Sequence, residues 1–396
     1  MSRVMTFLFA LTSAAAVGNL YWAQPLLGEI SAALHVSLAA TGALITATQI
    51  GYAAGVLLLV PLGDALNRRR LIPLMMVLSS VALFASASSP GYPVLLASLC
   101  MVGVTTVAGQ MLVPLAGDLA RDDQRGRVVG SITSGILIGI LTSRTISGLV
   151  AETFGWRAIF FLASATTFIL AVCLAFLLPA ERPRSRIPYG HLLLSIGKTV
   201  AAHRAIPPTL AISACGFGVF TMFWTGLTFL LSAPPFDFSV TQIGLVGLVG
   251  LAGALAAKRA GALHDHGWST VTVGAALLLA LFSLAVAAAG ATSVILILLA
   301  VLLIDIAIQG INVLNQTRLF SVAPAARSRV NTAFVVCNFV GGALGSILAG
   351  ILWQAGGWYL LVGGQGLLIV AALIVWTTSR ATLSATELHR RSAPVK

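Results

Sequence analysis

Amide and carboxyl side chains recur at helical spacing along one apolar stretch of the chain. They are Asp305, Gln309, Asn312 and Gln316, at i, i+4, i+7 and i+11, with Asn315 beside them. This spacing places them on one face of a helix. A row of amides could bind a polar solute, and a carboxyl group removed from water retains a proton more readily, so Asp305 could carry a proton or bind a cation. A structural ion pair or an interhelical hydrogen bond is the alternative for Asp305.

The composition shows what surrounds these polar groups. Of the 396 residues, 58% are hydrophobic and 9% are charged, and the mean hydropathy is +0.99. Soluble domains carry roughly 25% charged residues, so the solvent that suits this chain is lipid. The net charge of +12 would suggest nucleic acid as the partner of a soluble protein. Here we expect membrane lipid and a small-molecule substrate as partners, and no nucleic acid.

Twelve apolar segments have the length of roughly 20 residues that a membrane-crossing helix needs. They cover residues 6–27, 38–62, 71–89, 93–117, 127–151 and 157–178 in the first half, and 207–231, 240–260, 269–290, 293–316, 330–353 and 357–378 in the second. A polar, basic stretch separates the two sets. The predicted organisation is a six-helix half (1–180), a cytoplasmic linker (181–206), a second six-helix half (207–380) and a cytoplasmic tail (381–396).

The basic residues test this segmentation. When the loops are assigned alternately to the two sides, all but two of the 23 basic residues fall on one side. The exceptions are Arg157, on the other side, and Arg144, inside a span. Basic loops stay in the cytoplasm. The sequence therefore predicts a multi-pass protein of a bacterial inner membrane with both termini and the linker in the cytoplasm.

The second half repeats the first at an offset of about 202 residues. The matched positions are Arg125-Gly126-Arg127 with Arg327-Ser328-Arg329, Gly139 with Gly341, Gly148 with Gly350, Gly155-Trp156 with Gly357-Trp358, and Trp22 with Trp224. Each half has an even number of spans, so the repeats are parallel. Transporters place the substrate at such a repeat interface, near the midplane; a purely structural duplication is the alternative.

Further residues inside the spans are candidates for a central cavity. A charge near the bilayer centre costs about 2.5–3.5 kcal/mol on insertion scales, so Arg144 needs a cavity or a partner. It could bind an anionic group of a substrate or neutralise Asp305, and the sequence leaves both open. The other candidates are Asn19, Tyr21, Trp22 and Gln24 in the first span, Gln110 in the fourth and Trp224 in the seventh. For the first and fourth spans, a packing role is an equal alternative.

Two loop motifs carry a family resemblance. Gly63-Asp64-Ala65-Leu66-Asn67-Arg68-Arg69-Arg70 follows the second span, and a related copy, 261–267, follows the eighth. Both resemble the loop signature of the major facilitator superfamily, and the resemblance covers nearly the whole chain. Tyr21-Trp22-Ala23-Gln24-Pro25 and Gly155-Trp156-Arg157 resemble segments of bacterial efflux members of the drug:proton antiporter type. The fourth span lacks the arginine that is usual in that branch.

The resemblance implies an all-α membrane fold of twelve transmembrane helices in two pseudo-symmetric six-helix bundles. It also implies a monomer and proton-coupled efflux of a small organic solute by alternating access. Uptake or facilitated transport of a sugar, amino acid or other metabolite is the alternative, and a non-transporting membrane sensor is a remote one. In the family such loops act as cytoplasmic gates, which would assign that role to Asp64, Arg68, Arg69 and Asp265.

Other chemistry has little support in the sequence. No phosphate-binding loop of the Gly-x-x-x-x-Gly-Lys-Ser/Thr type is present, so ATP is not the expected energy source. The twelve predicted spans contain no histidine, which argues against an intramembrane hydrolase, and we do not expect the protein to be an enzyme. His264 and His266 are two residues apart with no third ligand in view, and we predict neither a metal site nor a cofactor.

Overall fold

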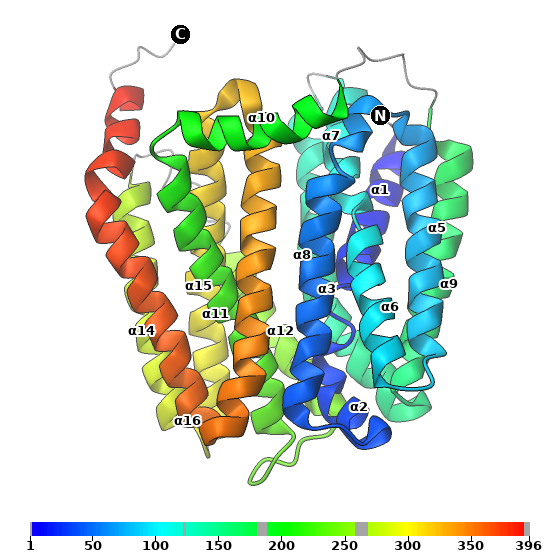
Figure 1. The fold of residues 1–396 in the computed structure, drawn as a ribbon, viewed down its shortest axis with the longest axis vertical. Helices are drawn as coiled ribbons and strands as arrows, with labels where there is room; N and C mark the ends of the chain where they lie inside the picture. The colour runs from blue at the N-terminus through cyan, green and yellow to red at the C-terminus, as the bar shows by residue number, and fades with distance from the viewer. Residues whose placement is uncertain (1, 122–123, 180–187, 258–267, 392–396) are drawn as a thin grey trace. The chain divides into compact units, whose positions relative to one another are not determined.

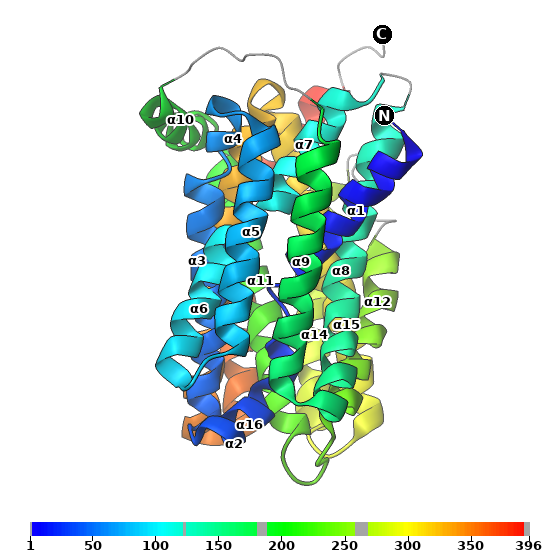
Figure 2. The same ribbon diagram turned by 90° about the vertical axis from the view of Figure 1, so that its right-hand side faces the viewer.

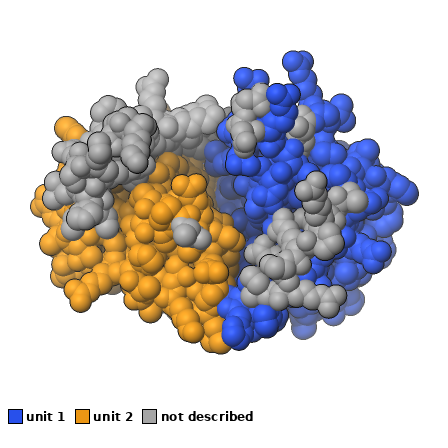
Figure 3. Space-filling model, turned by 90° about the horizontal axis from the view of Figure 1, so that it is seen from above, with its two compact units in different colours: residues 1–192, 237–248 blue, residues 193–236, 249–396 orange. Residues whose placement is uncertain are grey.

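The fold is built from apolar helices, because a helix satisfies its own backbone hydrogen bonds where water is absent. The computed structural model describes residues 2–121, 124–179, 188–257 and 268–391, and every regular element in these ranges is a helix (Figure 1). The chain divides into two compact units (Figure 3). Unit 1 comprises residues 1–192 and 237–248, and unit 2 comprises residues 193–236 and 249–396.

The helices of the first half lie in unit 1. They are α1 (Arg3–Gly18), η1 (Gln24–Leu26), α2 (Leu27–Leu34), α3 (Leu38–Leu58), α4 (Leu62–Ala65), α5 (Arg68–Ala87), α6 (Tyr92–Thr105), α7 (Ala108–Leu119), α8 (Arg125–Phe154) and α9 (Trp156–Leu177). The helices that follow are α10 (Tyr189–Ala202), α11 (Ile206–Leu231), α12 (Val240–Ala257), α14 (Ser269–Ala289), α15 (Val294–Val322), η2 (Pro324–Ala326) and α16 (Arg327–Arg391). The boundary between the units falls within α10 and again within α12.

The described helices agree with the predicted number of membrane crossings. Among the described residues, nine helices are long and apolar enough to cross a membrane, and Arg3–Gly18 and Val240–Gly250 are shorter apolar helices. The longest element, α16, is two helices joined across Gly356 and Gly357, whose backbone angles are not helical. Counting α16 twice and adding the two shorter helices gives a set that agrees with twelve spans. The predicted all-α membrane fold is confirmed.

Two spans expected to be continuous are interrupted in unit 1. The first span breaks after Gly18, continues through a turn and resumes as η1 at Gln24. Pro25 contributes to the break, because proline has no N–H with which to continue the α-helical hydrogen bonding back to Tyr21. The fourth span breaks between α6 and α7, at Thr106, whose hydroxyl forms a 2.7 Å hydrogen bond with the hydroxyl of Ser79 on α5. Each of these two predicted spans therefore consists of shorter helical segments joined near polar residues.

The repeated glycines mark the same kind of helix crossing in both units. In unit 1, a Cβ atom at Gly139 of α8 would overlap the backbone oxygen of Ala14 on α1. In unit 2, a Cβ atom at Gly341 of α16 would overlap the backbone oxygen of Ala214 on α11. Small residues allow helices to approach this closely inside a membrane. The matched glycines therefore serve close packing of corresponding helix pairs.

The segment between the two halves contains a helix. Within the predicted linker (181–206), the structure shows helix α10 over Tyr189–Ala202. The Tyr189 hydroxyl donates a hydrogen bond of 2.6 Å to the backbone oxygen of Leu58 at the end of α3. This contact fixes the start of α10 on unit 1.

Candidate functional site

Arg144 is the centre of a buried polar cluster in unit 1. The side chain is only 1% exposed. Its Nε donates a hydrogen bond of 2.8 Å to Oε1 of Gln24, and its Nη1 donates to the backbone oxygen of Ile140 at 3.4 Å. The guanidinium carbon lies 5.0 Å from the ring centroid of Tyr21, within the range of a cation–π interaction. Gln24 and Tyr21 thus orient the guanidinium group.

The break in the first span is what presents these partners to Arg144. Between Gly18 and η1 the chain turns, and Oδ1 of Asn19 accepts a hydrogen bond of 2.8 Å from the indole nitrogen of Trp22. The Asn19 amide donates in turn to the hydroxyl of Thr167 on α9 at 3.3 Å. Ser147, one helical turn from Arg144, donates to the backbone oxygen of Trp22 at 2.7 Å. The four candidates of the first span and Arg144 therefore form one connected group.

Gln110 lies on α7, close to the interruption of the fourth span. Its Nε2 donates a hydrogen bond of 3.1 Å to the hydroxyl of Tyr52 on α3, and Tyr52 is 1% exposed. Sequence reasoning missed Tyr52. Its signal would have been an aromatic hydroxyl in an otherwise apolar span, which needs a hydrogen-bond partner when buried.

Asp305 is the centre of a second buried cluster, in unit 2. The side chain is 2% exposed, and the Trp224 indole nitrogen donates a hydrogen bond of 3.3 Å to its Oδ1. Its other carboxyl oxygen, Oδ2, packs so closely against Gly250 of α12 that a Cβ atom there would overlap it. Helices α11, α12 and α15 thus enclose the carboxyl group.

The remaining polar residues of α15 contact two neighbouring helices. Asn315 is fully buried, and its amide donates to the hydroxyl of Ser213 on α11 at 2.8 Å. Asn312 and Gln316 are half-buried and bond to side chains of α16. Asn338 donates to Asn312 at 3.5 Å, and Gln316 donates to Asn331 at 2.9 Å. Gln309 is also half-buried. The polar face of α15 is therefore partly engaged in helix packing and partly accessible.

Arg318 is a buried residue that the sequence placed in a cytoplasmic loop. That placement was wrong, because α15 continues to Val322, beyond the predicted end of the span. Arg318 is 1% exposed and donates to the hydroxyl of Thr270 on α14 at 2.9 Å and to Oδ1 of Asn315 at 3.5 Å. Its spacing of three residues from Asn315 was the available signal.

The side chain of Arg68 stabilises the loop motif that follows α3. This side chain is 5% exposed, its Nε donates to the backbone oxygen of Gly63 at 2.8 Å, and its Nη1 lies 3.2 Å from Oδ2 of Asp118. Sequence reasoning missed Asp118. The side chain of Arg69 is exposed. The side chain of Asp64 and all of Asp265 lie outside the described residues.

Arg144 belongs to unit 1 and Asp305 to unit 2. Their direct pairing stays a prediction. Both lie within predicted spans, and each is buried beside an aromatic side chain, Tyr21 for Arg144 and Trp224 for Asp305. Ionisable residues in such positions mark ion and substrate pathways in membrane proteins.

Comparison with known proteins identifies the family. The family model of the Major Facilitator Superfamily matches residues 6–345. The chain is 38% identical over 377 residues to an uncharacterized transporter, YgaY, of Escherichia coli O157:H7, covering 95% of this chain and 96% of that protein. It is 33% identical to the probable transporter SCO4007 of Streptomyces coelicolor, covering 96% of this chain and 87% of that one. The nucleoside transporter NupG (D323A mutant) shares the fold, with a TM-score of 0.74, 15% identity and coverage of 95% and 99% of the two chains. This chain is a transporter that belongs to the Major Facilitator Superfamily.

Proposed function

We propose that this transporter exports a small organic solute in exchange for protons, by alternating access. The observation that carries the proposal is the carboxyl group of Asp305, buried among α11, α12 and α15. A carboxylate in such surroundings is costly unless it is neutralised by a proton or stabilised by donors. Asp305 can therefore alternate between a protonated state and an ionised state whose charge the Trp224 N–H stabilises.

The proton and the solute would be coupled through helix α15. Asp305 lies on the same helix as the half-buried amides of Gln309, Asn312 and Gln316. A change of charge at Asp305 alters the hydrogen bonding of α15 to α11, and with it the position of the amides that would contact the solute. In unit 1, Arg144 would contact a polar or anionic group of the solute, oriented by Gln24 and Tyr21. The loops that carry Asp64, Arg68, Arg69 and Asp265 would gate the cytoplasmic side.

The test is the variant Asp305→Asn. The solute is first identified by a screen in everted membrane vesicles with and without an uncoupler. In proteoliposomes, D305N should then lose the dependence of transport on a pH gradient and still bind the solute, because asparagine retains the shape and cannot exchange a proton. Transport by D305N that still follows the pH gradient would remove Asp305 from the coupling mechanism.

Asp237→Asn is the matched control. Asp237 is exposed, lies outside the predicted spans and has a positive φ of 46°, which asparagine also adopts readily. D237N should behave as the wild type. If D237N lost the dependence of transport on a pH gradient as D305N does, the effect of D305N would not be specific to Asp305.

The second candidate function is uptake or facilitated movement of a metabolite. The observation that favours it is the run of amides on α15, which suits hydroxylated metabolites as well as larger organic compounds. Transport that proceeds at the same rate in both directions and ignores an uncoupler would support this function over proton-driven export.

A further inference from the structure

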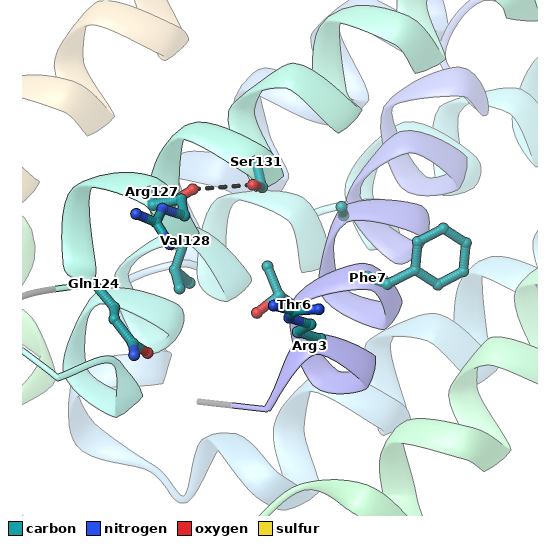
Figure 4. Close-up of a pocket in the computed structure, with 8 residues that line it drawn as sticks. Arg3, Thr6, Phe7, Gln124, Arg127, Val128 and Ser131 are labelled. Carbon is teal, nitrogen blue, oxygen red and sulfur yellow. Dashed lines mark hydrogen bonds between the residues drawn. The ribbon is translucent and has the colours of Figure 1, made fainter.

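A groove lies between the N-terminal turns of α1 and α8, well away along both helices from the Arg144 cluster. It has a volume of about 450 Å³ and is lined by Arg3, Thr6, Phe7, Ala10, Gln124, Arg127, Val128 and Ser131 (Figure 4). Both helices belong to unit 1 and pack against each other, and Figure 2 shows them adjacent in a side view. The groove is at the end of unit 1 that the charge pattern assigns to the cytoplasm.

The groove exists because of where the two helices touch. A Cβ atom at Gly135 would overlap the backbone oxygen of Ala10, and a Cβ atom at Gly139 would overlap the backbone oxygen of Ala14. Toward their N-termini the helices separate, and the groove opens between the turns that carry Thr6 and Val128 (Figure 4). The close crossing is therefore the floor of the groove, and its walls are the first turns of the two helices.

The chemistry of the walls fits a phosphate group. Arg3 contributes a guanidinium group from α1 and Arg127 contributes one from α8, and both side chains are exposed. Thr6 and Ser131 also line the groove, but their hydroxyl groups donate hydrogen bonds of 3.0 Å to the backbone oxygens of Ser2 and Arg127, so the two arginines are the donors for an anion. None of the described lining residues is acidic. Guanidinium groups bind phosphate oxygens through pairs of parallel N–H donors, and each of the two helices supplies one.

The location of the groove favours a lipid over a soluble anion. Val128 and Ala10 line the groove, and the ring of Phe7 lies on the side of α1 away from α8 (Figure 4). Val4, Phe7 and Leu11 of α1 are exposed by 73%, 69% and 43%, which is the pattern of a helix that faces acyl chains. The groove therefore lies beside lipid, at the helix ends where the charge pattern places the cytoplasmic head groups. Basic pockets between helices on the cytoplasmic side of a membrane are suited to anionic lipid head groups.

We propose that this groove binds one anionic phospholipid of the inner leaflet, with the phosphate between Arg3 and Arg127 and an acyl chain along the exposed apolar residues of α1. The bound lipid would join the N-terminal turns of two helices that continue to the Tyr21–Gln24 turn and to Arg144. The proposal does not depend on the solute or on proton coupling.

Native mass spectrometry of the full chain in detergent tests the proposal, with phosphatidylglycerol and phosphatidylcholine of identical acyl chains as probes. The wild type should bind the first phosphatidylglycerol about tenfold or more tightly than R3Q/R127Q, since each basic residue near the lipid surface contributes appreciably. Phosphatidylcholine should bind weakly to both proteins. The variant R3K/R127K should be intermediate, because lysine retains the charge and loses the fork.

The control is R70Q/R204Q, which removes the same charge from two exposed arginines on the predicted cytoplasmic side and should bind phosphatidylglycerol as the wild type does. Equally weakened binding of phosphatidylglycerol in R70Q/R204Q and R3Q/R127Q would overturn the proposal in favour of general charge attraction.

Millimolar inorganic phosphate should not displace the lipid. Displacement would overturn the assignment to a lipid and indicate a site for free phosphate. Unchanged circular dichroism of each variant confirms that the comparison is between folded proteins.

Discussion

The matched tryptophans show how two copies of one sequence have acquired different chemistry. Trp22 and Trp224 occupy corresponding positions of the repeat, and each donates its indole N–H to a buried side chain. The acceptor is the amide of Asn19 in unit 1 and the carboxyl group of Asp305 in unit 2. One unit therefore presents a neutral turn to a cation, Arg144, and the other presents a donor to an anion. The corresponding indoles therefore bond to groups of different charge in the two units.

At this scale, Arg144→Lys tests the role of the guanidinium group. Lysine retains the charge but cannot both bond to Gln24 and lie flat over Tyr21. We expect solute binding to weaken about tenfold, the loss of one hydrogen bond to a charged group, measured as the KM of transport. Arg157→Lys is the control, because Arg157 also stacks on an aromatic ring, that of Trp156 at 4.2 Å, and donates to the backbone oxygen of Ser89. An unchanged KM in R144K would show that Arg144 has a structural role and does not bind the solute.

At the scale of the element, the units depend on helix crossings that exclude any side chain. The crossings at Gly139 and Gly341 leave no room for a Cβ atom, so the two helices contact each other through their backbones. Such contacts are compact and rigid, which would suit helix pairs that move as one body in the proposed alternating access. The interruptions after Gly18 and at Thr106 make the chain less regular, because they allow it to change direction beside the polar residues.

Gly139→Ala should therefore lower stability by about 1–3 kcal/mol, the usual cost of overpacking. Gly130→Ala on the same helix is the matched control, because nothing lies within 4 Å of a Cβ atom there. That change should raise stability slightly, since alanine favours a helix by about 0.5–1 kcal/mol over glycine. Thermal unfolding in detergent measures both. A shift of the two midpoints in the same direction would contradict the packing model.

At the scale of the whole molecule, the distribution of basic residues predicts the orientation in the membrane. An impermeant maleimide should label Lys198→Cys, on the exposed side of α10, in everted vesicles and not in intact cells. Ser88→Cys, exposed at the end of α5, should show the reverse pattern and serves as the control. The native cysteines lie within apolar helices and are all partly buried. Labelling of Lys198→Cys from outside intact cells would reverse the topology and, with it, the assignment of the α1–α8 groove to the inner leaflet.

The sequence by itself indicated a lipid environment, a set of apolar spans with which the structure agrees, the repeat, and two charged residues inside those spans, because hydropathy and charge act locally along the chain. It also identified residues that the structure joins, such as Gln24 and Arg144. Only the tertiary structure decided which residue partners which, because Gln24 and Arg144 are 120 residues apart and Trp224 and Asp305 are 81 apart. The same reason accounts for Arg318, Tyr52 and Asp118, whose partners come from other helices. Hydrogen bonds between distant segments depend on how helices pack, and no local pattern records that.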